Sequence, residues 1–312
     1  MRLTPLRADS LLFLVAVIWG VTFIAQRQAM VLEVPPLAFN GVRYLLGALT
    51  VAPLLFLSRR ITPDSTATTH AATWRTLLLA GVLVGGAAAL GAGFQQVGLV
   101  ETEAGPAGFI TGLYVIFTPM IGMLIGVRTS RATWFGAGIA VAGMWFLGVE
   151  PDPDGGLQFR GSDFLILLGA VAWAIQVQLL ARFSPRLDPI QLVIAQFVGA
   201  AAFSFIASTA LEGPSAAFGI AAMFRVAPWE IIFTGVFAIG VAFLLQVVAQ
   251  RKSPPSHVAI ILSLEAPIAA LAGWLVLSES YGGRELLGFC LMMIGILVSQ
   301  VPRMLGGKSL RE

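Results

Sequence analysis

The sequence predicts an all-α integral membrane protein with ten transmembrane helices, arranged as two inverted-topology five-helix repeats. Three observations lead to this fold class. Of the 312 residues, 57% are hydrophobic and only 11% are charged, less than half of the ~25% that is usual in soluble domains. Ten apolar segments have about the length needed to cross a hydrocarbon core of ~30 Å. The same residue types also recur about 150 positions apart in the two halves of the chain.

Short connections join most of the ten apolar segments. The longer connections are residues 59–74, 150–161 and 212–227, and the last, which is half apolar, is expected to lie along the membrane surface. The run that starts at Asp9 is interpreted as a first transmembrane helix and not as a signal peptide, because it is long enough to span. The segments are 9–30, 36–58, 75–98, 105–126, 132–149, 162–183, 188–211, 228–250, 257–278 and 284–303.

Lysine and arginine are distributed unevenly between the two sets of segment ends. Fourteen lie on the side that holds both termini, and three, Arg160, Arg225 and Arg284, lie on the opposite side. Because basic residues stay on the cytoplasmic side, both termini are expected in the cytoplasm. This use of basic residues at the membrane boundaries accounts for the isoelectric point near 9.5 without a nucleic-acid partner.

Residues of the first half recur in the second. Asp9 precedes Trp19 by ten residues, as Asp163 precedes Trp173. Because five helices per unit is an odd number, the second unit (151–312) must enter the membrane from the side opposite to the first (1–150). This is the architecture of many secondary transporters, with a site near the midplane between the halves. The other pairs are Pro36 and Pro189, Arg43 and Gln196, Gln96 and Gln250, Pro119 and Pro267, and Gly136/Gly143 and Gly288/Gly295.

Four motifs carry a family resemblance: Trp19-Gly20-x-x-Phe23, Ser263-Leu264-Glu265-Ala266-Pro267, Leu277-Ser278-Glu279 and the pair Gly288 and Gly295. With them the chain resembles, over nearly its whole length, the ten-helix EamA-type members of the drug/metabolite transporter superfamily. It departs from the family pattern at Arg131, where a glutamate is usual, and at Ala174, where a glycine is usual.

The resemblance implies a secondary transporter of the bacterial inner membrane that works by alternating access. The implied activity is export of small organic metabolites, above all amino acids, aromatic ones included. Export of other metabolites or drugs, such as organic cations or nucleosides, is the alternative. An intramembrane enzyme is a more distant one.

Glu265 lies deep within the apolar run 260–279. A charge there costs at least ~2.5 kcal/mol, so function is the first interpretation: the carboxyl takes a proton, or holds a substrate amine or a coupling cation. The alternative is a hydrogen bond that fixes helix packing. At helical spacing Ala269 and Ala272 share its face and Trp274 lies opposite, so Glu265 is expected to face the protein and Trp274 the lipid.

Arg43 lies on a polar face together with Asn40. Three interpretations stay open: it binds a substrate carboxylate, it pairs with a backbone carbonyl or Glu265 for structure, or it reaches the outer headgroups. Arg27, near the end of the first segment, is expected to reach the headgroups. Pro119 and the proline that follows Glu265 lie inside apolar segments, where proline kinks a helix and gives each half a joint that can bend.

Two tryptophans lie at mid-helix near amide side chains, which suits a cavity for zwitterions or aromatic solutes as well as ordinary packing. Tryptophans at helix ends are interpreted as interface anchors. Tyr114 lies at a depth where its hydroxyl needs a partner or water, and Gln246 either lines a pore or bonds between helices. The predicted substrate-binding residues are Trp19, Arg43, Tyr114, Trp173, Gln176, Gln246 and Glu265.

The sequence carries no nucleotide-binding or hydrolase motif, and its two histidines, His70 and His257, do not form a metal cluster. We therefore expect no enzymatic activity, no cofactor, no metal and no nucleic-acid partner. The expected partners are a small-molecule substrate and the lipid bilayer. The oligomeric state does not follow from the sequence.

Overall fold

A computed structural model describes residues 4–61, 74–127, 129–148, 161–277 and 282–304, and these ranges contain helices and no strand. Eight stretches are long and apolar enough to cross a membrane, which confirms an all-α chain with many candidate spans. The described residues of the predicted segments 132–149 and 284–303 are helical, but they do not meet these criteria, so ten spans remain a prediction. The eight stretches are Pro5–Val31, Pro36–Leu55, Trp74–Gly98, Ala107–Leu124, Gly161–Phe183, Pro189–Leu211, Pro228–Gln250 and Pro255–Val276.

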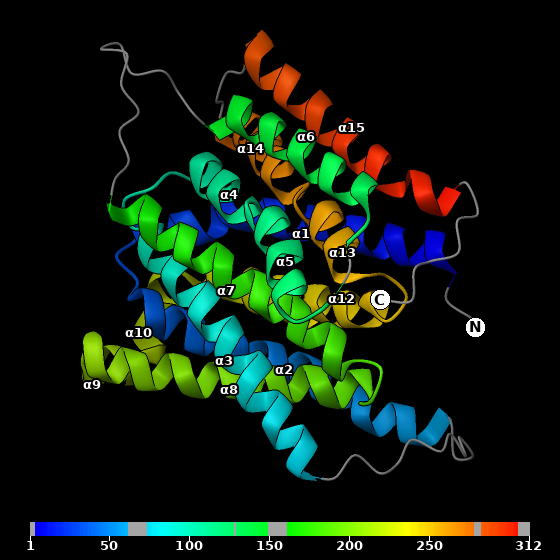
Figure 1. The fold of residues 1–312 in the computed structure, drawn as a ribbon. Helices are drawn as coiled ribbons and strands as arrows, with labels where there is room; N and C mark the ends of the chain where they lie inside the picture. Colours follow the sequence, from blue (N-terminus) through cyan, green and yellow to red (C-terminus); the bar gives the residue numbers. More distant parts are fainter. Residues whose placement is uncertain (1–3, 62–73, 128, 149–160, 278–281, 305–312) are drawn as a thin grey trace.

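Six helices form the first half of the chain (Figure 1). The first begins with a capped turn: the Thr4 hydroxyl accepts a hydrogen bond from the Arg7 N–H, and Pro5 occupies the first helical position, where a missing N–H costs nothing. The six helices are α1 (Pro5–Val31), α2 (Pro36–Ile61), α3 (Trp74–Gly98), α4 (Ala104–Gly112), α5 (Tyr114–Leu124) and α6 (Arg131–Gly148).

The second half is divided more finely than the sequence predicts. The segment 228–250 contains a π-helical stretch, and the segment 212–227 forms two short helices whose place relative to a membrane stays a prediction. The elements are α7 (Gly161–Phe183), α8 (Pro189–Leu211), α9 (Pro214–Phe218), α10 (Ile220–Val226), α11 (Pro228–Phe233), the π-helix η1 (Thr234–Val241), α12 (Ala242–Gln250), α13 (Pro255–Leu262), α14 (Glu265–Leu277) and α15 (Gly283–Met304).

Two predicted spans are each divided by a short turn. Residues 263–264 separate α13 from α14, and Pro267 explains this break, because its ring clashes with the carbonyl four residues earlier, that of Ser263. The other break, at Leu113 between α4 and α5, lies six residues before Pro119. There Gly112 is the last residue of α4. That the two prolines kink each half and let it bend stays a prediction; Pro119 lies inside α5.

Helices α6 and α15 lie side by side at one edge of the bundle (Figure 1). Glycines make this approach possible in a reciprocal way. A Cβ at Gly143 would lie 2.6 Å from the carbonyl oxygen of Gly288, and a Cβ at Gly295 would lie 2.6 Å from that of Gly136. Small residues allow helix backbones to come this close within a membrane.

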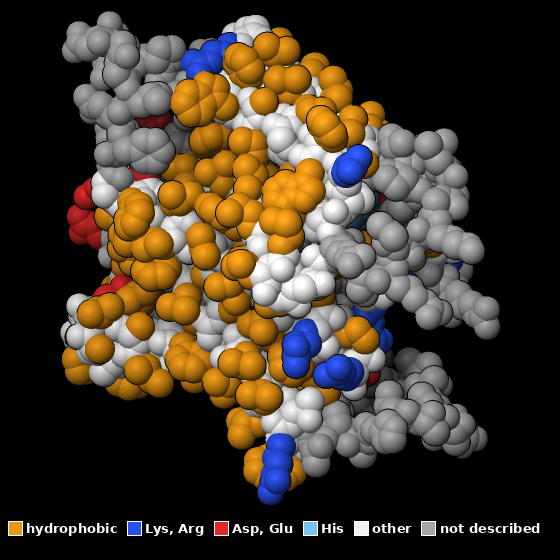
Figure 2. Space-filling view, viewed as in Figure 1, with side chains coloured by type: hydrophobic (Ala, Val, Ile, Leu, Met, Phe, Trp, Pro, Cys, Tyr) orange, Lys and Arg blue, Asp and Glu red, His pale blue; other side chains and the backbone are white. Residues whose placement is uncertain are grey.

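Apolar side chains cover most of the face seen in Figure 2, and charged ones gather at its margins. Acidic side chains lie towards the left of this view, and most of the basic ones lie towards the right and the bottom. Large exposed side chains such as Trp74, Phe135 and Trp229 belong to the apolar surface of the molecule. A broad apolar face with charges at its margins is what a membrane-embedded bundle requires.

Candidate functional site

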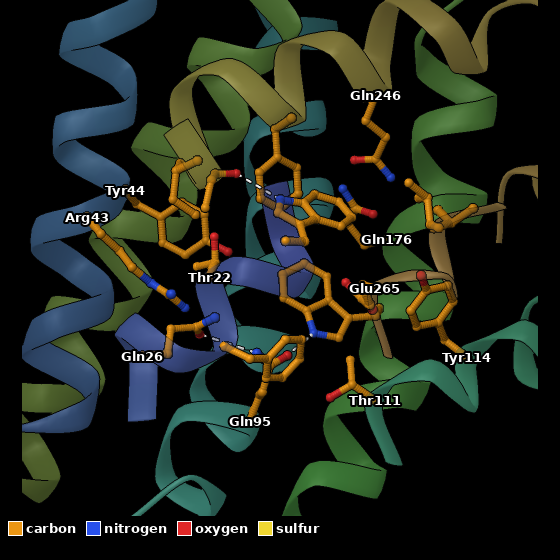
Figure 3. Close-up of a pocket in the computed structure, with 18 residues that line it drawn as sticks. Thr22, Gln26, Arg43, Tyr44, Gln95, Thr111, Tyr114, Gln176, Gln246 and Glu265 are labelled. Carbon is orange, nitrogen blue, oxygen red and sulfur yellow. Dashed lines mark hydrogen bonds between the residues drawn. The ribbon is translucent and has the colours of Figure 1, made fainter. Parts of the chain in front are cut away.

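All seven residues predicted to bind substrate line one cavity in the middle of the bundle (Figure 3). The cavity has a volume of about 50 Å³. It is therefore narrow but large enough for several waters. Its predicted residues come from six helices: Trp19 of α1, Arg43 of α2, Tyr114 of α5, Trp173 and Gln176 of α7, Gln246 of α12, and Glu265 of α14.

Glu265 is the first residue of α14, directly after the break, and only 3% of it is exposed. As predicted, Ala269 is buried on the same side and Trp274 is half exposed on the other. Gly20 of α1 lies against the Glu265 backbone, since a Cβ at Gly20 would be 2.8 Å from the Glu265 carbonyl oxygen. The absence of a side chain at Gly20 thus allows α14 to bring Glu265 to the cavity.

Tyr114 holds the corresponding position in the other broken segment, as the first residue of α5. Its hydroxyl interacts with the Glu265 carboxyl, but it forms no hydrogen bond of good geometry with any described residue. The hydroxyl of Thr111, one turn earlier, also lacks a partner within the described chain. Figure 3 shows these three side chains together at one side of the cavity. Buried hydroxyls without partners are rare in proteins, so this side is suited to a polar solute or water.

Arg43 lies on another side of the cavity, next to Tyr44 (Figure 3). It is 3% exposed, and its guanidinium lies 5.2 Å from the centre of the Phe39 ring, within cation–π distance. Within the described residues it forms no ion pair and no hydrogen bond, and its Nε has no partner. The interpretation that Arg43 pairs with Glu265 or with a backbone carbonyl is therefore wrong for these residues, and so is the headgroup interpretation.

Both mid-helix tryptophans are half-buried and bonded through their indole N–H groups. Trp19 donates to the Ala238 carbonyl of η1 at 2.9 Å, and Trp173 donates to the side-chain oxygen of Gln95 at 3.0 Å. Phe243 packs between them, with its ring centre 4.9 Å from that of Trp19 and 5.9 Å from that of Trp173. The bonds fix the indoles at their N–H ends, while the ring faces contribute an apolar wall.

Two amides at the cavity lack partners within the described part of the chain. They are the side-chain nitrogen of Gln176, and both polar atoms of Gln246. Gln250, one turn beyond Gln246, instead donates to the Val177 carbonyl. Of the two interpretations, interhelical bonding describes Gln250, and Gln246 faces the cavity.

The comparisons with known proteins agree with this geometry. The sequence profile of the EamA-like transporter family matches residues 6–149 and again residues 160–300. This chain belongs to the EamA-like transporter family. It is thus a multi-pass membrane transporter, as the family and its apolar helices indicate.

Relatives of this EamA-like chain are themselves named as transporters. An uncharacterized transporter of Archaeoglobus fulgidus is 30% identical over 298 residues, which cover 94% of this chain and 85% of the relative. The uncharacterized inner membrane transporter YedA of Escherichia coli is 30% identical over 166 residues, about half of each chain. The uncharacterized transporter YoaV of Bacillus subtilis is 23% identical, with 91% and 94% covered.

A solved crystal structure has the same fold as this EamA-like transporter. The two superimpose with a TM-score of 0.71, over 95% of this chain and 98% of the other, at 17% sequence identity. At this identity the likeness concerns the fold alone.

Sequence reasoning missed several residues that line the cavity of the EamA-like transporter. Phe243 has no polar group and no repeat partner that would distinguish it in the sequence. Gln95 also lines the cavity, but nothing in the sequence separates it from its neighbour Gln96. The Gln96 amide instead donates to the Gln26 backbone carbonyl. That Arg27 reaches the headgroups stays a prediction. Its Nη1 donates to the carbonyls of Leu99 and Val100 at the end of α3, 2.8 and 2.7 Å away, and so caps that helix. Within the described residues no group of three or more His, Cys, Asp or Glu side chains could hold a metal.

Proposed function

We propose that this chain is a secondary transporter that exports small organic metabolites, above all amino acids, aromatic ones included, across a bacterial inner membrane. The central cavity is its substrate site, reached by alternating access between two inverted five-helix units, residues 1–150 and 151–312. The observation that carries this proposal is a buried arginine and a buried carboxyl on one cavity, neither paired with the other.

An α-amino acid matches this arrangement group by group. Its carboxylate suits Arg43, whose planar guanidinium binds such groups in a bidentate way. Its ammonium suits the Glu265 carboxyl and the Tyr114 hydroxyl, and an apolar or aromatic side chain suits the rings of Trp19 and Trp173. The cavity volume of about 50 Å³ lies well below the ~300–1,000 Å³ typical of ligand pockets. Its narrowness implies that side chains move apart as a solute enters.

Reciprocal contacts support the inverted repeat. The sequence pairs Gly136 with Gly288 and Gly143 with Gly295. Exchange of the halves therefore replaces Gly143 by Gly295 and Gly288 by Gly136. The Gly143–Gly288 contact becomes the Gly295–Gly136 contact, and in each an added Cβ would lie 2.6 Å from the facing carbonyl oxygen. A two-fold relation between the halves requires this reciprocity.

A second set of contacts within each half follows the same rule. Gln96 of α3 donates to a backbone carbonyl of α1, and its repeat partner Gln250 of α12 donates to a backbone carbonyl of α7. In the first half the bond joins the first predicted span to the third, and in the second half it joins the sixth to the eighth. A five-helix repeat would relate these two pairs of spans. An inverted relation places the site between the halves.

The orientation of the chain and the membrane that holds it rest on two further observations. The distribution of Lys and Arg, fourteen against three, supports cytoplasmic termini. YedA of Escherichia coli, which matches half of this chain, is named an inner membrane transporter. Export as the direction rests on the family resemblance of the sequence.

Organic cations and nucleosides are the alternative substrates. A cation suits Glu265 and the tryptophan rings, but Arg43 on the same cavity would repel it. A nucleoside would use the rings and the amides without needing either charge. The two charged residues therefore favour the zwitterion over both.

Counterflow in liposomes that contain only this protein tests the proposal. Labelled amino acids, nucleosides and organic cations are offered in turn to vesicles preloaded with the same unlabelled solute. We expect counterflow of amino acids, with Arg43→Gln raising their KM about tenfold or more, since a hydrogen bond to a charged group is worth ~1.5–3 kcal/mol. Arg27→Gln is the matched control, because Arg27 lies in a predicted span but outside the cavity.

Two results would contradict the assignment. Counterflow of cations that increases in Arg43→Gln would point to the cation alternative. Absence of counterflow for every solute, from protein that melts cooperatively, would argue against secondary transport and return the intramembrane enzyme to consideration.

A further inference from the structure

The beginning of α13 is joined to α1 by a contact between charged or chargeable groups. His257 Nε2 lies 3.1 Å from the Asp9 carboxylate, and the two side chains are 5% and 16% exposed. We call this pair the α13 contact. Asp9 also takes part in further interactions. The contact links the first half of the chain to the second near the start of α1.

The beginning of α4 is joined to α7 by a hydrogen bond to a carboxylate. The Thr102 hydroxyl, two residues before α4 begins, donates to the Asp163 carboxylate at 2.8 Å. We call this pair the α4 contact, and Asp163 too has further interactions. It links the second half to the first near the start of α7, at the opposite end of the bundle from the start of α1 (Figure 1).

Exchange of the two halves relates the two contacts. Asp9 and Asp163 are repeat partners, each ten residues before a cavity tryptophan, or ~15 Å along the helix. Each aspartate contacts the divided span of the other half. Asp9 does so near the start of α13, and Asp163 does so near the start of α4. The two contacts therefore occupy equivalent places at opposite ends of the cavity.

Each contact lies at the start of a short half-helix that a turn joins to the rest of its span. The eight residues of α13 run from the α13 contact to the break at 263–264, and the nine residues of α4 run from the α4 contact to the break at Leu113. Directly after the breaks stand Glu265 and Tyr114, which line the cavity. Release of one contact thus frees a half-helix next to the site at one end only.

We propose that α13 and α4 are the two gates of the transport cycle, and that the Asp9–His257 and Thr102–Asp163 contacts hold them closed at opposite ends. This inference rests on the proposed transport function. In the structure both contacts are formed. Alternating access then requires that one of them breaks while the other stays.

Thiol labelling at each end of the cavity tests the gates without any substrate. In a Cys290→Ala background, Val177→Cys reports the end of α7 near the α13 contact, and Thr111→Cys reports α4. Both positions line the cavity and are buried. The rate of reaction with a charged methanethiosulfonate reagent is measured for the full chain in detergent. Asp9→Ala and His257→Ala release the α13 contact, and Asp163→Ala and Thr102→Val release the α4 contact.

The expected pattern is reciprocal. Asp9→Ala and His257→Ala raise the rate at position 177 about tenfold and leave position 111 within about twofold, since a charged hydrogen bond shifts an equilibrium by a factor of ten or more. Asp163→Ala and Thr102→Val do the reverse. His257→Gln, whose amide still donates to Asp9, stays close to the parent protein.

The control is Asp188→Asn, which changes a carboxylate that caps α8 and should alter neither rate. Unchanged rates in all four release variants overturn the proposal, and so does a rise at both positions in any one of them. If an aspartate variant fails to fold, its partner variant decides the outcome. Reciprocal labelling without counterflow would overturn the transport assignment, whereas counterflow without reciprocal labelling would overturn only the gates.

Discussion

Gly20→Ala is the change that most directly tests how the site is assembled. A Cβ at this position would lie 2.7 Å from two carbons of Ile268 and 2.8 Å from the Glu265 carbonyl oxygen, where ordinary contacts begin at 3.4 Å. The atoms that it meets belong to α14, and one of them is backbone. Helices α1 and α14 must therefore separate by roughly 0.6 Å, because packed atoms do not compress, and Glu265 must move with α14.

Two opposing effects set the magnitude. Forcing an extra methyl group into a packed contact costs ~1–3 kcal/mol, whereas alanine favours a helix over glycine by ~1 kcal/mol. Gly138→Ala isolates the second effect, because a Cβ at Gly138 would meet no atom within 4 Å. The difference in unfolding free energy between the two variants should therefore be ~1–3 kcal/mol, with Gly20→Ala the less stable.

The assay is thermal unfolding of both purified variants, followed by tryptophan fluorescence in detergent, with counterflow measured in parallel. Gly20→Ala should melt below Gly138→Ala and should transport at least tenfold more slowly, since a ~1 Å displacement of a reacting group costs up to 10²-fold in enzymes. Equal melting temperatures and equal counterflow would refute the close contact of α1 with α14 as the support of Glu265.

Glu265→Gln should insert and fold but lose pH-dependent flux or weaken binding of ammonium-bearing solutes, and a wild-type flux-against-pH profile would remove the carboxyl from the mechanism. Trp19→Ala should reduce counterflow more than Trp74→Ala at equal membrane abundance, because Trp19 lines the cavity and Trp74 is 68% exposed; equal losses would assign both rings to packing. In a cysteine-free background, an impermeant reagent added outside cells should modify Glu33→Cys and not Arg186→Cys, and the opposite pattern would invert the predicted topology.

Much of the fold follows from the sequence because helix ends and mid-helix residues carry local signals. Pro36 and Pro189 begin helices where they are predicted to, since proline suits the first helical position. Trp19 and Trp173 are marked by depth and repetition, and both line the cavity. That they bind substrate stays a prediction.

Other features depend on contacts between distant segments and leave no local signal. The π-helical stretch 234–241 packs against α2, and its sequence reads as an ordinary apolar span. The break at Leu113 follows a glycine among many others. Phe243 reaches the cavity because the rings of Trp19 and Trp173 converge on it, a relation that only the assembled bundle creates. Its type and spacing are those of any buried phenylalanine.

The reciprocal glycine contact between α6 and α15 also bears on how such a chain can arise. Gly143 meets Gly288 as Gly295 meets Gly136. In the proposed inverted repeat this surface would be isologous, because each side would present the patch that the other side presents. Two copies of one five-helix polypeptide, inserted in opposite orientations, would make the same contact as a homodimer. Fusion of duplicated genes would then preserve an interface that already existed, and after it each half could change independently. The unequal pair Arg43 and Gln196, one lining the cavity and the other outside it, is what such divergence produces.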